Sequence, residues 1–284
     1  MYAGDIYGSW FINFGPNDGG AEMKPLSDFP RAVKSQIRYV LTDIDDTVTT
    51  DGQLSAESYM ALENLTKAGF KVIPITGRPA GWCDHFARMW PVDAVVGENG
   101  AFYFRYEHHA KKMTCRFWKE AGERAEDRKR INRLRQSIPL NVPGSGIASD
   151  QDYRVADLAV DFCEDVDPLD QESIDRIVSL FEEAGAKAKV SSIHVNGWFG
   201  DYDKLSMTEV LFREAYNLEL DQVLDQVVFS GDSPNDAPMF ARFPHSVGVA
   251  NVKDFIGRIP HEPTWVTEKR SGRGFVELAK MLLS

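Results

Sequence analysis

Three aspartates follow one apolar run in the stretch "RYVLTDIDDTVTT", residues 38–50. The run has the pattern of a short buried strand, and Asp43, Asp45 and Asp46 come directly after it, with Thr47 next. Carboxylates crowded at one strand end repel one another and resist losing their water. A turn or a helix cap also favours aspartate at such a place, so this stretch needs partners elsewhere in the chain before it indicates chemistry.

Three further polar clusters stand where predicted strands end or helices begin. They are "TGR" at 76–78, "DYDKLS" at 201–206 and "GDSPND" at 231–236. In open α/β sheets, ligands bind at the carboxyl ends of the strands, whatever the order of those strands in the sequence. We therefore expect the four clusters to meet at one edge of a sheet.

The carboxylates of these clusters suit a hard divalent cation. The candidate metal ligands are Asp43, Asp45, Asp232 and Asp236. Mg²⁺ prefers oxygen ligands in near-octahedral geometry and usually keeps waters or a phosphate oxygen among them. Lys204 and the backbone N–H groups of Thr76 and Gly77 would add positive potential for a phosphate. The sequence thus predicts a Mg²⁺ site beside a phosphate site.

Strands and helices alternate around these clusters. After the first strand, Ser55 can cap a helix that turns Leu62 and Leu65 inward and ends at Gly69. The next strand lies at 71–76, and the pattern resumes after residue 200 with three further helices and two strands. Continuous apolar strands between helices indicate a Rossmann-like, doubly wound parallel sheet in the α/β class.

An inserted α+β module interrupts this core. Residues 119–137 form a highly charged predicted helix, and the alternating run "YRVADLAVDF" predicts a strand with one wetter face. A second helix buries the residues Ile174, Ile177, Val178 and Phe181 and stops at Gly185. We expect the core at 37–103 and 193–284, with the cap at 104–192.

The bulk composition excludes several classes of protein. The chain has 284 residues and a net charge of −11, which argues against a nucleic-acid or membrane-surface partner. Its three cysteines have no paired spacing, and no apolar run is as long as a membrane span, so we expect a reduced, cytoplasmic protein. Residues 1–36 are an N-terminal extension whose aromatic patch, "SWFINF", we expect to pack on the domain or on a partner subunit.

The ordered motifs "DIDDT", "ITGR", Lys204 and "GDSPNDAPMF" resemble those of the haloacid dehalogenase superfamily. The "GENGA" at 97–101 and the position of the insertion are similar to its subclass IIB, the Cof-like group. That group includes sucrose-phosphate, trehalose-phosphate and mannosyl-phosphoglycerate phosphatases, and phosphomannomutase. The resemblance covers most of residues 38–284.

The resemblance implies a catalytic role for four residues. Asp43 is the nucleophile that forms an aspartyl-phosphate, and Asp45 is the general acid that protonates the leaving alkoxide and later activates water. Thr76 hydrogen-bonds the phosphoryl oxygens, with Gly77 beside it. Lys204 balances the charge of nucleophile and phosphate.

The resemblance also implies the metal shell. Asp232 is a direct Mg²⁺ ligand, together with the Asp43 carboxylate and the Asp45 backbone carbonyl. Asp236 and Asn235 complete the shell, through water or by touching phosphate. Asn99 lines the phosphate pocket, although "NG" is also a plain turn signal.

Several neighbours have simpler interpretations. Asp46, which stands where many relatives have Gly, is expected to act as a cap or in an ion pair. Arg78 is expected to form a structural salt bridge. In the insertion, Arg154 and Asp157 either reach toward the substrate or belong to a solvated sheet face.

These features together predict a Mg²⁺-dependent phosphatase. Its expected substrate is a small phosphorylated metabolite, with a sugar phosphate favoured because several subclass IIB relatives use one. A phosphotransferase or phosphomutase needs the same aspartate pair and metal, so it stays an alternative. A non-catalytic sugar-phosphate sensor would have lost the nucleophile or the acid, and this chain keeps both. We expect a monomer or a homodimer.

Overall fold

One parallel sheet organises the larger part of the chain in the computed structural model, which describes residues 23–191 and 193–284. Its strand order is β1-β13-β12-β11-β2-β3, and every neighbouring pair is parallel. The strands are β1 (Lys24–Pro25), β2 (Tyr39–Thr42), β3 (Lys71–Pro74), β11 (Val227–Gly231), β12 (Ser246–Gly248) and β13 (Trp265–Val266). The predicted α/β class and doubly wound parallel sheet are confirmed.

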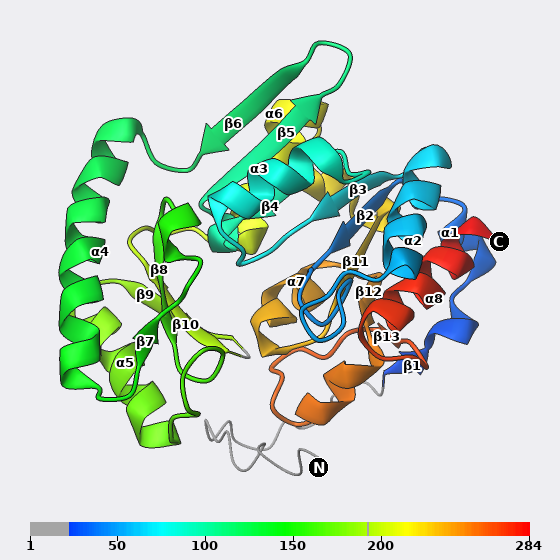
Figure 1. Cartoon of the computed structure of the whole chain (residues 1–284). Coiled ribbons are helices and arrows are strands. Elements are labelled where there is room, and N and C mark those ends of the chain that lie inside the picture. The colour runs from blue at the N-terminus through cyan, green and yellow to red at the C-terminus, as the bar shows by residue number, and fades with distance from the viewer. Residues whose placement is uncertain (1–22, 192) are drawn as a thin grey trace.

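Helices cover both faces of this sheet (Figure 1). They are α1 (Arg31–Lys34), α2 (Ala56–Lys67), α3 (Ala80–Met89), α6 (Lys204–Tyr216), α7 (Ala237–Arg242) and α8 (Ser271–Leu283). Val40 of β2 packs in one apolar cluster with α2, α3 and α8, whereas its neighbour Leu41 packs in the opposite cluster with α6 and α7. This alternation shows why the strands are apolar on both sides, as in other buried parallel sheets. Ser55 caps α2 as expected, accepting from the Ser58 N–H.

Short 3-10 helices fill the connections. They are η1 (Leu26–Asp28), η2 (Glu98–Gly100), η3 (Gln151–Tyr153), η4 (Leu220–Gln222), η5 (Leu224–Gln226), η6 (Pro234–Asp236) and η7 (Ala250–Phe255). Two of them, η2 and η6, carry motifs that the sequence singled out.

The core sheet begins before the boundary expected at residue 37. Lys24 pairs with Trp265 and Pro25 with Val266, so β1 is an edge strand of the main sheet. Leu26 and Phe29 are buried in the same core cluster as α2 and α8. A strand of two residues containing a proline leaves no alternation in the sequence, which is why it was not predicted. The expected aromatic arm "SWFINF" lies outside the described residues.

A hairpin extends the core next to β3. The strands β4 (Val95–Gly97), β5 (Phe102–Glu107) and β6 (Lys112–Phe117) form an antiparallel sheet, and a bridge between Ile75 and Val96 joins it to β3. The expected start of the cap at residue 104 therefore falls inside β5, in a hairpin that continues from the core.

The inserted module has its own sheet and its own core. Its helices α4 (Ala121–Asn141) and α5 (Gln171–Glu183) pack on the antiparallel strands β7 (Gly146–Ile147), β8 (Asp157–Asp161), β10 (His194–Trp198) and β9 (Lys187–Val190). The buried residues of α5 are Ile174, Ile177 and Phe181, as its spacing predicted, with Val178 partly buried. The sheet runs to Trp198, beyond the expected end of the cap at residue 192. This module, drawn in green, lies beside the core (Figure 1).

No helix among residues 23–191 and 193–284 has the length and apolar character needed to cross a membrane.

Candidate active site

Three buried aspartates meet at the carboxyl edge of the main sheet. Asp43 follows β2, Asp232 follows β11, and Asp236 lies in η6. These two strands are neighbours, and the Asp43 N–H donates to the carbonyl of Ser230 at 2.9 Å. One carboxylate oxygen from each aspartate lies within 4.8 Å of the others. The expected convergence of distant acidic motifs is present in the fold.

Gly231 makes room for this convergence. A Cβ at Gly231 would lie 2.4 Å from Oδ2 of Asp236, so any other residue would push that carboxylate away. The same oxygen accepts the Asp232 N–H at 3.1 Å. The glycine at the strand end therefore fixes Asp236 against the backbone that carries Asp232.

Lys204 lies among the three carboxylates. Its Nζ donates to Oδ1 of Asp43 at 2.7 Å and to Oδ1 of Asp236 at 3.1 Å, and the residue is 5% exposed. The α6 helix begins at Lys204 behind the N-cap Asp203, which forms a capping box with Ser206. Capping of α6 thus fixes the position of Lys204, whose ammonium group pairs with the Asp43 carboxylate.

Gly100 sets the position of this helix start. Its backbone is left-handed, with φ at 103°, and a Cβ there would lie 1.9 Å from the Asp203 carbonyl oxygen. Only glycine permits so close an approach. The "GENGA" loop is therefore packed directly against the N-terminus of α6.

Burial dominates the electrostatics of the cluster. It raises the pKa of Asp43 to about 7, although Lys204 opposes the shift. Burial, followed by the charges of Asp236 and Asp43, raises the pKa of Asp232 well above its usual range. Burial disfavours the charged form of Lys204, but Asp236 and Asp43 outweigh it and raise the pKa of the lysine.

The donor set fits a divalent cation. Three carboxylates facing one ammonium group leave two negative charges uncompensated when all are ionised. Hard cations such as Mg²⁺ take carboxylate oxygens, and a buried site of this charge is stabilised when one is bound. Asp45 was expected among the metal ligands, but its side chain is not part of the cluster. A role for its backbone carbonyl stays a prediction.

Asn251 belongs to the site, although no role was predicted for it from the sequence. Its Nδ2 donates to Oδ2 of Asp232 and to the Asp46 carbonyl, both at 3.0 Å, and its Oδ1 accepts the Ser271 N–H. Asn251 is the last residue of the apolar stretch "SVGVAN" at 246–251, and its place at a strand end was the available signal. Thr47 also contacts Asp232, through its hydroxyl at 3.4 Å.

The second motif lies at the adjoining strand end. Thr76 follows β3, its hydroxyl accepts the Arg78 N–H at 3.0 Å, and its carbonyl accepts the Asn99 N–H at 3.2 Å. A Cβ on Gly77 would lie 3.3 Å from Oδ1 of Asn99, so these two residues pack closely. The fold brings Thr76, Gly77 and Asn99 together. Asn235, by contrast, accepts a hydrogen bond from the Ser233 hydroxyl at 3.0 Å, and within the described part of the chain its side chain makes no hydrogen bond to the acidic cluster.

Arg78 pairs with the expected general acid. Its guanidinium donates to both carboxylate oxygens of Asp45, at 2.7 to 3.0 Å. The salt bridge expected for Arg78 is present. Because its partner is Asp45, Arg78 also lies in the candidate site. The sequence offered no signal for this pairing, because the two residues are 33 positions apart.

Glu98 joins the cap to the core. Its carboxylate accepts the N–H groups of Ala80, in the core, and of Val155, Ala156 and Asp157, in the cap, at 2.6 to 3.2 Å. Burial, followed by the charge of Asp157, raises the pKa of Glu98 to about 8, whereas Arg154 and the N–H donors oppose that shift. No role was predicted for Glu98 from the sequence, because "GENGA" gives no sign of what the glutamate binds.

Arg154 and Asp157 correct an expectation. Their side chains are 2% and 0% exposed, so neither lies on a solvated sheet face. They form an ion pair at 3.1 Å, and Arg154 also donates to the Gly77 carbonyl at 3.1 Å. Both are engaged between cap and core, because the face of β8 that carries Asp157 is turned toward the core loops. The segment 150–157 is therefore docked on the site.

The cap sheet presents further polar side chains on the same face. Asn196 of β10 donates to Oδ2 of Asp157 at 3.0 Å and is paired across the sheet with Lys189 of β9. Burial lowers the pKa of Lys189, and the positive charge of Lys204 in the core adds to this effect. The cap thus contributes both hydrogen-bonding and positively charged groups near the acidic cluster.

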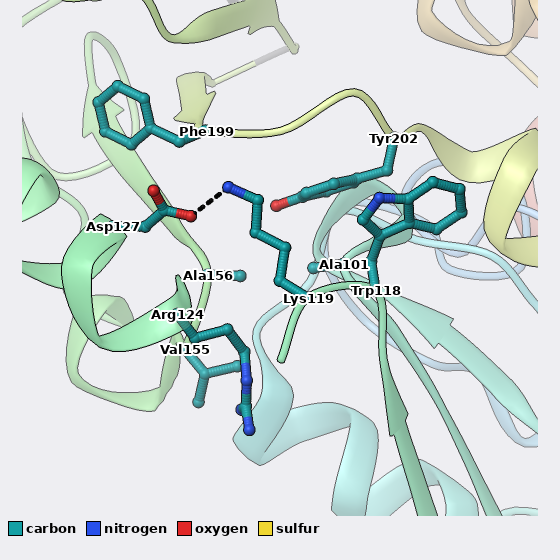
Figure 2. Close-up of a pocket in the computed structure, with 9 residues that line it drawn as sticks. All are labelled: Ala101, Trp118, Lys119, Arg124, Asp127, Val155, Ala156, Phe199 and Tyr202. Carbon is teal, nitrogen blue, oxygen red and sulfur yellow. Dashed lines mark hydrogen bonds and ion pairs between the residues drawn. The ribbon is translucent and has the colours of Figure 1, made fainter. Parts of the chain in front are cut away.

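A separate small pocket lies where the two connections between core and cap run side by side. Figure 2 shows Trp118 and Lys119 of the outgoing connection facing Phe199 and Tyr202 of the returning one. The Trp118 and Tyr202 rings lie 6.1 Å apart, and Lys119 pairs with Asp127 of α4. None of the acidic-cluster residues lines this pocket. We interpret it as a region where the two connections between core and cap pack against each other, and not as a substrate site.

His194 makes the cap sensitive to acid. Burial, followed by the charge of Arg154, lowers the pKa of His194 to about 4, and its Nε2 lies 2.8 Å from Glu164. Unfolded histidine gains its proton near pH 6.5, so stability due to the neutral ring is present above that pH and lost as the pH falls toward 4. The shift corresponds to a loss of about 3 kcal/mol in the free energy of unfolding.

We expect His194→Gln to reduce this acid dependence. Urea unfolding of the wild type and the variant between pH 7 and 4 measures it, and the difference between their slopes isolates the histidine from the carboxylates that titrate in both. Parallel pH profiles for the two proteins would contradict the assignment.

Asp46 lies at a position whose backbone conformation suits glycine better than aspartate. It has a left-handed backbone, with φ at 53°, which is the conformation that glycine adopts most readily. Burial, followed by the charge of Asp45, raises the pKa of Asp46, so the extra carboxylate is also disfavoured electrostatically. We expect Asp46→Gly to be more stable than Asp46→Ala by about 1 kcal/mol, since alanine must adopt left-handed φ. Thermal unfolding of the two variants checks this, and equal melting temperatures would refute it.

Comparisons with known proteins agree with this geometry. Residues 40–121 match the family described as haloacid dehalogenase-like hydrolase. No curated protein matches the sequence.

Solved structures share the fold over nearly the whole chain. A protein of Thermoplasma acidophilum is 21% identical, with a TM-score of 0.66 over 87% of this chain and 98% of its own. The sucrose-phosphatase of Synechocystis sp., solved with sucrose and phosphate, is 16% identical, with a TM-score of 0.60 over 87% and 98%. A haloacid dehalogenase-like hydrolase of Bacteroides thetaiotaomicron is 13% identical, with a TM-score of 0.61 over 86% and 98%. At these identities the likeness shows a common fold, cap included.

Proposed function

We propose that this chain, whose residues 40–121 match the haloacid dehalogenase-like hydrolase family, is a Mg²⁺-dependent phosphatase of a small phosphorylated metabolite. The observation that carries the proposal is the buried group of Asp43, Asp232 and Asp236 around Lys204 at the carboxyl edge of the sheet. The three carboxylates would hold a divalent cation, and that cation together with Lys204 would offset the negative charge of a phosphoryl group.

Asp43 is the proposed nucleophile. Lys204 occupies its Oδ1, while its Oδ2 accepts no hydrogen bond from the described residues and is available to attack. Attack forms a bond between Oδ2 and phosphorus and breaks the bond between phosphorus and the ester oxygen. The leaving alkoxide takes a proton from Asp45, the proposed general acid.

Water completes the reaction. Asp45 takes a proton from a water molecule, which attacks the phosphorus of the aspartyl-phosphate and breaks its bond to Asp43. The products are the alcohol and inorganic phosphate, and both aspartates return to their starting states. Thr76 and Gly77, packed against Asn99, are the proposed phosphate-binding groups.

The residues that would hold Mg²⁺ are Asp43, Asp232 and Asp236, with the Asp45 backbone carbonyl; Asn235 would act through water or phosphate. Bound there, the cation would neutralise phosphoryl charge in the transition state. Asn251 holds Asp232 in place.

The proposed substrate class follows from the cap. Asn196 and Lys189 supply polar groups on the sheet face turned toward the site, as recognition of a hydroxyl-rich leaving group requires. The fold is shared with a sucrose-phosphatase, and a sugar phosphate is therefore the favoured substrate. A cytoplasmic location and a monomeric or homodimeric state stay part of the proposal.

A panel of phosphorylated metabolites, assayed for released phosphate with and without Mg²⁺, tests the proposal. We expect hydrolysis of at least one sugar phosphate without an added acceptor, and loss of that activity in excess chelator. Turnover only with a bisphosphate activator would instead identify a phosphomutase. Full activity in chelator would overturn the proposed role of the metal.

A further inference from the structure

Lys189 lies on the face of the cap sheet that is turned away from the helices of the cap. The strands β9 and β10 are antiparallel, and Lys189 is paired directly with Asn196. The residues at the alternate positions, Ala188, Val190 and Val195, pack with α4 and α5 in the apolar core of the cap. Since successive side chains of a strand point to opposite faces, Lys189 and Asn196 share the other face. Figure 1 shows the strands of the cap between these helices and the core.

Asn196 links this face to the loops of the active site. Its Nδ2 donates to Oδ2 of Asp157 at 3.0 Å, and the backbone N–H of Asp157 donates to the Glu98 carboxylate at 3.2 Å. Glu98 belongs to the "GENGA" loop, which packs through Gly100 against the N-terminus of α6. Lys189, the register partner of Asn196, therefore faces the part of the core that carries the acidic cluster.

The ammonium group of Lys189 lacks a counter-ion among the residues that the structure describes. It is half-buried, and within those residues it forms no ion pair and no hydrogen bond. Burial lowers its pKa and the charge of Lys204 adds to this effect, whereas Asp203 and Asp236 oppose it. Both carboxylates are engaged elsewhere, because Asp203 caps α6 and Asp236 binds Lys204. A cation in such a place is normally paired, so this one is available to an anionic ligand.

We propose that Lys189 binds a second anionic group of the substrate, a carboxylate or a phosphate, on the leaving group and away from the transferred phosphoryl group. The transferred group already has Lys204 and the proposed cation on the core side, whereas Lys189 belongs to the facing cap. A bound anion would supply the missing counter-ion and offset the cost of burying the ammonium group. The inference rests on the proposed phosphatase function and narrows its substrates to phosphate esters that carry two anionic groups.

Three matched pairs of phosphate esters isolate the second charge. 3-Phosphoglycerate differs from glycerol 3-phosphate, and 6-phosphogluconate from sorbitol 6-phosphate, in a carboxylate that replaces a hydroxymethyl group. Fructose 1,6-bisphosphate differs from fructose 6-phosphate in a second phosphate. The two carboxylate pairs differ in the distance between the second anion and the ester, and the third pair distinguishes a phosphate from a carboxylate.

We expect kcat/KM of the wild type to be higher for the anionic member of at least one pair, by about tenfold or more, as for a hydrogen bond between charged groups. Lys189→Met should remove most of this preference. Lys189→Arg should keep part of it, since arginine retains a cationic donor. Each ester is also tested as a competitor of p-nitrophenyl phosphate, so its binding is measured whether or not it is hydrolysed.

Lys187→Met is the matched control. Lys187 is the first residue of β9, is exposed and pairs with Asp201 at 2.6 Å. Its substitution removes the same charge from the same strand, so it should leave the ratio of the two kcat/KM values in each pair unchanged. Melting temperatures of all variants, compared with the wild type, show that each is folded under assay conditions.

A wild type without preference for the anionic member of any pair would overturn the inference, as would a Lys189→Met variant that keeps the preference. Equal losses on all esters in Lys189→Met, p-nitrophenyl phosphate included, would also overturn it, because the lysine would then act on the transferred phosphoryl group or on the fold. Failure of the proposed function looks different: the wild type would then release phosphate from none of these esters, or Asp43→Asn would release it equally well.

Discussion

Asp43→Asn is expected to abolish phosphate release, with kcat falling at least about a thousandfold for every substrate of the wild type. The amide is nearly isosteric with the carboxylate, and its oxygen can still accept the hydrogen bond from Lys204. It is, however, a very poor nucleophile toward phosphorus, so no acyl-phosphate forms. Phosphate release under saturating substrate measures the loss.

The Asp43→Asn variant should keep its fold, so a loss of its activity can be distinguished from a loss of folding. Burial raises the pKa of Asp43 to about 7, so removing this carboxyl group relieves an unfavourable charge in the metal-free protein. We therefore expect a melting temperature in chelator at least as high as that of the wild type. Mass spectrometry of the rapidly quenched wild type should show phosphate on the peptide that contains Asp43. Retained turnover in the variant would refute the nucleophile assignment.

Lys204→Met is expected to damage both activity and stability. The methionine has a side chain of similar length but leaves the buried carboxylates of Asp43 and Asp236 without their ammonium partner. Loss of one partner from a buried ion pair typically costs about 3 to 5 kcal/mol in the free energy of unfolding. Loss of the charge that faces the phosphoryl group should lower kcat by about a hundredfold or more.

Metal should restore stability to this variant more than to the wild type. A divalent cation bound among the carboxylates replaces the missing positive charge, and a ligand that binds only the folded state stabilises it by mass action. Urea unfolding in excess chelator and in Mg²⁺ measures the difference, independently of turnover. Lys187→Met is the control, because Lys187 is exposed and pairs with Asp201 away from the cluster. An equal Mg²⁺ effect on Lys204→Met and the wild type would contradict the site.

The acidic cluster implies a trade between stability and function. Burial and the neighbouring Asp236 raise the pKa of Asp232 well above its usual range, so the metal-free protein holds this carboxylate at a cost. Under the proposed function, a bound divalent cation would offset this charge and so compensate for its cost to stability. The same reasoning explains why three aspartates that repel one another can follow directly on apolar strands.

Local sequence determined the strands, the helices and the candidate groups of the site. The apolar runs before Asp43 and Asp232 predicted strands buried on both faces, and capping residues such as Ser55 predicted where helices begin. These features depend on residues close together in the chain, and parallel strands necessarily bring their carboxyl ends to one edge. For that reason the meeting of Asp43, Asp232 and Asp236 could be predicted without a structure, whereas Lys204 was selected by its place before a helix and between the other motifs.

Only the tertiary structure decided how the cap meets this edge. Glu98 binds the N–H groups of the cap segment that follows Arg154, Arg78 joins Asp45 to Asp150, and Asn251 holds Asp232. The same holds for β1, whose two residues become a strand only because β13 lies beside them. Each of these contacts joins groups far apart in the sequence or in separate modules, and its partners are chosen by the docking of one packed surface on another. Sequence periodicity and residue spacing do not predict how these surfaces dock. The contacts of Glu98, Arg78 and Asn251 could therefore be identified only from the tertiary structure.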